Sequence, residues 1–96
     1  MIDFSQRLLI PDDVLFREME DEAVILNLET EAYFGLDEIG THMWGVLAAS
    51  PTLDDAFALL LETYDVDAAT LRADLDAFVT ELVNAGLVSL SVAQSE

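Results

Sequence analysis

The stretch NLETEAYFGLDEIG, residues 27–40, contains the change of hydrophobic period that decides the fold. Its first residues end a strand, expected at 23–28, which is rich in apolar and β-branched residues. A polar turn then leads into a second short strand at 32–36. From Asp37 onward, apolar residues recur at helical spacing, and Asp37 is the expected N-cap of that helix. The stretch therefore predicts two paired strands that run directly into a helix.

Toward the N-terminus, residues 14–19 predict one more strand, joined to the strand at 23–28 by an acidic turn. Such short connections favour an antiparallel meander of three strands. In the central strand of this meander, one face is expected to carry Val24, Leu26 and Leu28. Residues 1–12 are expected to form a flexible arm.

Toward the C-terminus, the helical period predicts three helices. The first carries an apolar stripe made of Ile39, Met43, Val46 and Leu47. The second begins at Thr52, with Asp55 three residues later in a capping-box pattern. The third covers about residues 68–85 and ends at Gly86, because glycine readily adopts the left-handed conformation that terminates helices.

These elements describe one α+β domain, residues 1–96. Residues 87–90 are a candidate short C-terminal strand, and residues 91–96 are expected to be a flexible tail. A three-stranded antiparallel sheet followed by three helices, of which the second and third are joined by a tight turn, is typical of a winged helix-turn-helix. A chain of 96 residues is within the usual size of one domain.

The chain is strongly acidic. Three arginines and no lysine face twenty acidic residues, which gives a formal net charge of -17. Nucleic-acid binding draws its affinity from cationic side chains that neutralise phosphates, so we expect no nucleic-acid partner. Two interpretations of the acidity stay open, namely solubility in a saline cytoplasm and attraction to a basic partner. The absence of cysteine, of a basic leader and of a long apolar run predicts a cytoplasmic protein with no membrane partner.

The residue types that catalysis or metal binding needs are scarce. His42 is the single histidine, and no Gly-x-Ser-x-Gly turn is present. His42 with Asp37 or Glu38 would supply two ligands, fewer than a zinc site needs. We therefore expect a binding protein and no enzyme, with no metal and no cofactor. His42 is expected on a helix surface or in a satisfied, partly buried position, and Trp44 is expected in the core.

The strand at 32–36 is the last of the meander and is therefore expected to be a sheet edge. If Phe34 and Leu36 face the helices, Tyr33 and Gly35 point outward, because side chains alternate along a strand. Glycine leaves room for another backbone to approach. Such an edge is either protected against pairing or used to add a peptide as a further strand.

Two segments, VILNLETEAYFGLDEIGTHMWGVL and TLDDAFALLLETYDVDAATLRADLDAFVTELVNAGLV, resemble the PqqD-like family of peptide-recognition domains. The resemblance covers about residues 14–90 and is strongest to the stand-alone leader-binding proteins of lasso-peptide pathways. It implies a winged helix-turn-helix that does not bind DNA. In such domains the leader of a ribosomally made precursor peptide adds as a strand to the third strand and lies against the third helix.

The resemblance also implies a peptide-binding site. Its strand residues would be Glu31, Ala32, Tyr33, Phe34, Gly35 and Leu36, and its helix residues Leu71, Arg72, Asp74, Leu75, Phe78 and Val79. The helix residues overlap the stripe that the core needs, so a core role is an equal alternative for each of them. Arg72 either anchors a peptide carboxylate or pairs with Asp76 at i+4.

The resemblance implies a carrier that presents the precursor to a separate leader peptidase and works alongside a cyclase. One alternative is a PqqD-type chaperone that hands its peptide to a radical SAM enzyme. Another is a structural or dimerisation module, in which the edge strand pairs with its own copy. A DNA-binding winged helix is disfavoured by the absence of lysine. We expect a monomer or a weak homodimer.

Overall fold

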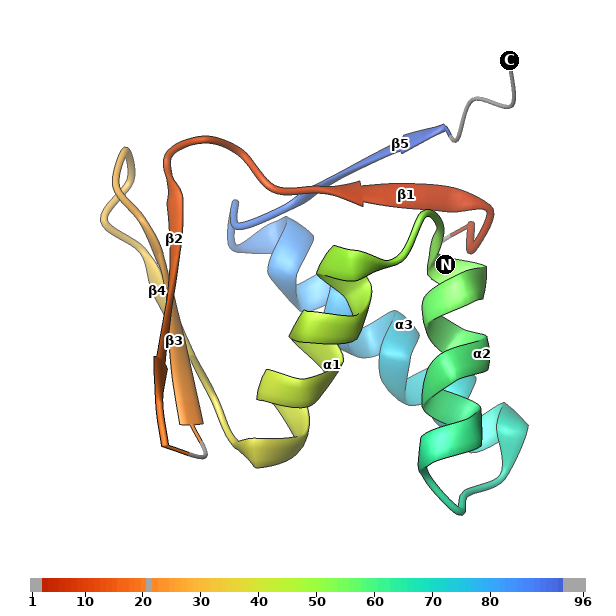
Figure 1. The fold of residues 1–96 in the computed structure, drawn as a ribbon. Coiled ribbons are helices and arrows are strands. Elements are labelled where there is room, and N and C mark those ends of the chain that lie inside the picture. Colours follow the sequence, from red (N-terminus) through yellow and green to blue (C-terminus); the bar gives the residue numbers. More distant parts are fainter. Residues whose placement is uncertain (1–2, 21, 93–96) are drawn as a thin grey trace.

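The computed structural model describes residues 3–20 and 22–92, which form two small antiparallel sheets and three helices (Figure 1). In chain order the elements are β1 (Gln6–Leu9), β2 (Val14–Met19), β3 (Glu22–Asn27), β4 (Tyr33–Leu36), α1 (Glu38–Ala49), α2 (Leu53–Thr63), α3 (Ala68–Asn84) and β5 (Ser89–Val92). One sheet has the strand order β2-β3-β4, and β1 pairs with β5 in the other. The predicted α+β architecture, with its three-stranded sheet, three helices and C-terminal strand, is confirmed.

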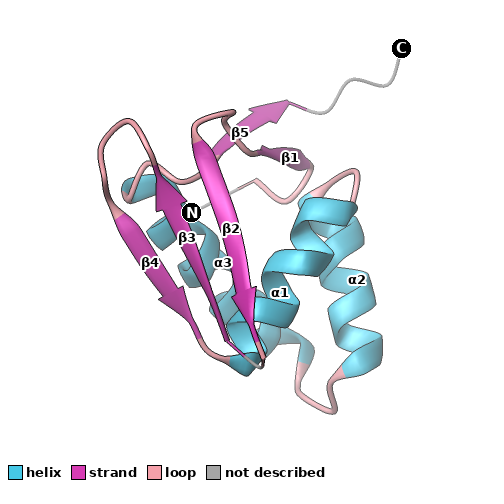
Figure 2. Ribbon diagram, turned by 60° about the vertical axis from the view of Figure 1, so that its left-hand side comes forward, coloured by secondary structure: helices cyan, strands magenta, loops and turns pink. Residues whose placement is uncertain are grey.

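The helices lie against one face of the three-stranded sheet, and no described helix or strand covers the other face (Figures 1 and 2). On β3 the covered face carries Ala23, Ile25 and Asn27, which are all buried. The predicted face is the outer one, where Leu28 is 53% exposed. Both faces of this strand are largely apolar, so alternation alone does not show which of them turns toward the helices.

Each helix begins with a side-chain cap. Asp37 Oδ1 accepts a hydrogen bond of 2.8 Å from the Gly40 N–H, and Thr52 Oγ1 accepts one of 3.2 Å from the Asp55 N–H. Asp67 caps α3 in the same way. Such caps satisfy backbone donors that have no partner inside the helix. The predicted caps of the first two helices are confirmed.

The end of α3 is a Schellman motif. Gly86 has a φ of +76°, and its N–H donates to the Val83 carbonyl at 3.0 Å. The Leu87 N–H donates to the Leu82 carbonyl, also at 3.0 Å. These two bonds satisfy carbonyls that the helix leaves free at its end, and the left-handed residue between them favours glycine. The predicted terminator Gly86 is therefore confirmed.

The first helix lies between the three-stranded sheet and α2. Trp44 is 4% exposed, and its ring stacks on Phe16 of β2 with centroids 5.8 Å apart and planes at 12°. The core position predicted for Trp44 is confirmed. The predicted stripe is wrong at Ile39, which is 53% exposed, because the buried residues of this helix are Gly40, Trp44 and Leu47.

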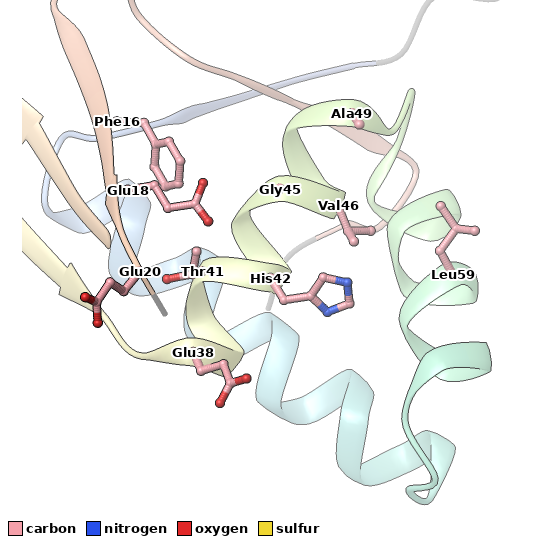
Figure 3. Close-up of a pocket in the computed structure, with 10 residues that line it drawn as sticks. All are labelled: Phe16, Glu18, Glu20, Glu38, Thr41, His42, Gly45, Val46, Ala49 and Leu59. Carbon is pink, nitrogen blue, oxygen red and sulfur yellow. The ribbon is translucent and has the colours of Figure 1, made fainter. Parts of the chain in front are cut away.

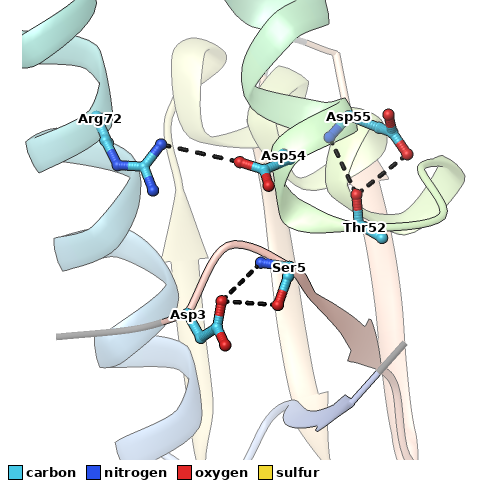
Figure 4. A network of polar contacts seen from close by, with 6 residues as sticks. All are labelled: Asp3, Ser5, Thr52, Asp54, Asp55 and Arg72. Atoms are coloured by element: carbon cyan, nitrogen blue, oxygen red, sulfur yellow. Dashed lines mark hydrogen bonds and ion pairs between the residues drawn. The ribbon is translucent and has the colours of Figure 1, made fainter. Parts of the chain in front are cut away.

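The N-terminal segment differs from the flexible arm that the sequence predicts. Phe4 is 2% exposed, and its carbonyl accepts a hydrogen bond of 2.8 Å from the Asp54 N–H at the start of α2. The Arg72 guanidinium lies 4.0 Å from the centre of the Phe4 ring. It also pairs with Asp54 at 3.8 Å (Figure 4). Residues 3–12 thus supply a core side chain and the strand β1.

The N–H and the hydroxyl of Ser5 donate to the carboxylate of Asp3 and lower its pKa (Figure 4). At the other end, Ser91 and Val92 belong to β5, although the sequence predicts a flexible tail over 91–96. The remaining parts of the predicted arm and tail, residues 1–2 and 93–96, lie outside the described residues.

Candidate functional site

Within the described residues, no strand pairs with the outer edge of β4, which is therefore open. In the sheet order β2-β3-β4, this strand has β3 as its hydrogen-bonded neighbour on one side. The Asn27 N–H donates to the Ala32 carbonyl at 2.8 Å. Because hydrogen-bonded pairs alternate along an antiparallel ladder, Phe34 and Leu36 also direct their backbone groups toward β3. The N–H and C=O groups of Tyr33 and Gly35 therefore point away from the sheet, and the predicted edge position of this strand is confirmed.

Side chains leave this edge accessible. Tyr33 is 75% exposed, and a Cβ atom added at Gly35 would meet no atom within 4 Å. Gly35 also borders a shallow hollow of about 280 Å³ between the ends of β3 and β4. An extended backbone can therefore approach Tyr33 and Gly35 without displacing a side chain.

The inner side of β4 is apolar and faces α3. Leu36 is 5% exposed, while Phe34 is half-buried against the cluster that contains Leu36 and Leu82. Phe78 of α3 is half-buried and packs against the same cluster. Phe34 and Phe78 thus present apolar surface from the strand and from the helix, as a peptide with apolar anchor side chains requires. The orientation predicted for Phe34 and Leu36 is confirmed.

The other helix residues of the predicted site lie elsewhere. Leu71, Leu75 and Val79 are at most 3% exposed and pack with the buried residues of α2. Arg72 is engaged with Phe4 and Asp54, and Asp74 is exposed. Of the six predicted helix residues, the structure therefore brings Phe78 together with β4 in one apolar cluster. For the other five helix residues, contact with a peptide stays a prediction from the sequence. The contact surface proposed below does not include them.

The turn before β4 is built from Glu31 and Ala32. Glu31 is exposed, has a φ of +65° and donates its N–H to the Asn27 carbonyl at 2.7 Å. A positive φ is uncommon for a residue with a side chain. It marks here the tight turn that reverses the chain into β4. Both residues therefore set the start of the edge strand.

Asn27 holds this turn in place, and the site predicted from sequence does not include it. It is 6% exposed, and its Oδ1 accepts from the backbone N–H groups of Glu29 at 2.8 Å and Thr30 at 3.1 Å. Its Nδ2 donates to the Gly86 carbonyl at 2.7 Å. An asparagine at the end of an apolar strand was the sequence signal for this role, since a buried amide needs several partners.

His42 lies on the exposed surface of α1, as the sequence predicts. Its Nδ1 and the Tyr64 hydroxyl share a hydrogen bond of 2.7 Å. Within residues 3–20 and 22–92, the structure contains no group of three His, Cys, Asp or Glu side chains that could hold a metal ion. In the same part of the chain, no helix has both the length and the apolar character needed to cross a bilayer.

Comparison with known proteins agrees with this geometry. Residues 22–88 match the family model of coenzyme PQQ synthesis protein D, PqqD. The chain belongs to the PqqD family. The matched segment of this PqqD-family chain begins at the first residue of β3 and ends just before β5. It therefore contains the open edge, Asn27 and all three helices.

A solved structure extends the similarity to nearly the whole PqqD-family chain. That structure is TbiB1 in complex with the TbiA(beta) leader peptide, at 31% sequence identity and a TM-score of 0.75. The alignment covers 92% of this chain and 99% of the TbiB1 chain. No curated protein matched the chain. The resemblance inferred from the sequence segments is thus confirmed at the level of both family and fold.

Proposed function

We propose that this chain is a non-catalytic carrier that binds the leader segment of a ribosomally synthesised precursor peptide of the lasso type. The observation that carries the proposal is the open edge of β4, with the outward N–H and C=O groups of Tyr33 and Gly35. The similarity to TbiB1, which binds a leader peptide, supports it.

In this mode the leader adds to β4 as a fourth strand. Its backbone pairs with Tyr33 and Gly35, and main-chain hydrogen bonds of this kind supply affinity with little dependence on sequence. Apolar side chains of the leader then contact Phe34 and Phe78, which are half-buried in the free protein. Burying their remaining surface contributes roughly 25 cal/mol per Å². Selectivity for the leader comes from the fit of these side chains.

The carrier presents the bound precursor to a separate leader peptidase and works alongside a cyclase, in the cytoplasm where precursors are made. A second candidate function is that of a PqqD-type chaperone for a radical SAM enzyme, which the family match favours. Both functions use the same edge and differ in the enzyme that receives the peptide. A short precursor gene beside this one, together with genes for a peptidase and a cyclase, would favour the first function, and a neighbouring radical SAM enzyme gene would favour the second.

The test is a titration of the fluorescently labelled leader of the precursor encoded beside this gene, followed by anisotropy. We expect a Kd of about 1 μM or tighter, and no saturable binding of a scrambled leader. Tyr33→Asp should weaken binding while the circular dichroism spectrum is retained, because Tyr33 is exposed at the edge. Equal binding of the leader and its scrambled form would contradict the proposal. Sizing with and without leader shows whether pairing between copies competes for the edge.

A further inference from the structure

In the part of the chain that the structure describes, a second open sheet edge lies at β2, on the opposite side of the sheet from β4 (Figure 2). The Leu28 N–H donates to the Asp13 carbonyl at 2.7 Å, just before this strand begins. By the alternation of an antiparallel ladder, Phe16 and Glu18 then direct their N–H and C=O groups away from β3. These groups form a short row of donors and acceptors that a further strand could pair with.

A groove adjoins this edge. It has a volume of about 480 Å³ and crosses the outer side of α1 between β2 and α2 (Figure 3). Phe16, Glu18 and Glu20 line it on the side of β2, and Leu59 lines it on the side of α2. Its floor includes Gly45, where an added Cβ would meet no atom within 4 Å. The volume lies within the range of pockets that bind small molecules.

The rim of the β2–α1 groove is acidic. The groove is lined by Glu18, Glu20 and Glu38. None of these three glutamates forms an ion pair within the described residues. The ion pair found in that part of the chain joins Arg72 to Asp54. Carboxylates around an apolar groove attract cationic side chains and repel acidic ones. Thr41 also lines the groove, and its hydroxyl oxygen has no hydrogen-bond partner in the part of the chain that the structure describes.

We propose that the β2–α1 groove binds a basic, extended segment of the enzyme that processes the precursor. The segment pairs with Phe16 and Glu18, places an apolar side chain over Gly45 and directs cationic side chains toward the rim. A second copy of this chain does not fit this chemistry, since its net charge is also -17. The proposal rests on the proposed function, because a leader on β4 leaves β2 free for the enzyme.

The test uses the full chain and a labelled ten-residue probe of alternating valine and arginine, with alternating valine and glutamate as the control probe. We expect the basic probe to bind and the acidic probe not to bind. The double variant Glu18→Lys/Glu20→Lys should weaken binding by about tenfold, which corresponds to about 1.4 kcal/mol. Its matched control is Glu29→Lys/Asp65→Lys, which changes the net charge equally on exposed residues outside the groove.

A second variant tests the groove by shape. Gly45→Leu places a side chain on the floor and should also weaken probe binding by about tenfold. Ala48→Leu adds the same side chain at an exposed position of α1 outside the groove and should have no effect. Equal losses in the variants and their controls, or competition between probe and leader, would overturn the proposal. Leader binding measured in the same variants separates the two sites, since a leader that fails to bind while the probe binds contradicts only the assignment of β4.

Discussion

The side-chain amide of Asn27 donates to the carbonyl of Gly86 at 2.7 Å and so joins two residues that are 59 positions apart in the chain. One partner ends β3 and the other follows α3. The same amide accepts two N–H groups of the turn that leads into β4. This single side chain therefore connects the open edge strand to the end of the helix that carries Phe78.

Asn27→Ala should lower the free energy of unfolding by about 1–3 kcal/mol, because it removes three hydrogen bonds and leaves the Gly86 carbonyl without its side-chain donor. Urea unfolding measures the change. Asn84→Ala, at an exposed position near the end of α3, is the matched control and should change stability by less than about 0.5 kcal/mol. Similar values for the two variants would mean that the Asn27 amide does not stabilise the fold.

Gly45→Ala should stabilise the protein by roughly 1 kcal/mol, since alanine has the higher helix propensity and the added Cβ meets no atom within 4 Å. The control is Gly40→Ala on the same helix, where the new Cβ would lie 3.3 Å from the Asp37 carboxylate that caps it. No comparable gain is expected there. Thermal and urea unfolding of both variants check the difference, and a larger gain at Gly40 would contradict the geometry of the helix start.

Phe4→Ala should destabilise the protein by about 3–5 kcal/mol, the range for a large buried aromatic side chain. Phe4 is 2% exposed and packs with α2, α3 and the Arg72 guanidinium. Unfolding in urea measures the loss, with Leu9→Ala in β1 as the control, because Leu9 is 41% exposed. If Phe4→Ala left the stability unchanged, residues 3–12 would be the flexible arm that the sequence predicts.

Methylation of single backbone nitrogens of the leader should weaken its binding with a period of two residues. In a strand added to β4, alternate N–H groups of the leader face Tyr33 and Gly35, and the intervening ones face solvent. Titration of a series of singly N-methylated leaders against the unmodified protein checks this without any change to the fold. Losses at consecutive residues, or at none, would be inconsistent with strand addition.

Features that depend on local interactions could be predicted from the sequence. The caps Asp37 and Thr52 and the terminator Gly86 follow from residue types within a few positions of each helix end. The edge position of β4 follows from short connections, and the outward direction of Tyr33 follows from strand alternation. Which backbone groups of β4 point away from the sheet follows from the ladder register, which the Asn27–Ala32 hydrogen bond fixes.

Features that depend on distant contacts could not be predicted in this way. The burial of Phe4 depends on packing against α2 and α3, and the face of β3 that turns inward depends on where Trp44 lies. Arg72 is drawn to Phe4 and Asp54 and not to the edge strand. In each case the sequence contains a suitable side chain, but its partner comes from a part of the chain more than fifteen residues away.

The central claim is that the leader pairs with the outward backbone groups of β4. Amide hydrogen exchange, resolved by residue with and without saturating leader, tests it most directly. In the free protein the N–H groups of Tyr33 and Gly35 should exchange rapidly, and leader binding should protect both. Unchanged exchange at these two amides, with protection at Phe16 and Glu18 of β2 instead, would contradict the claim.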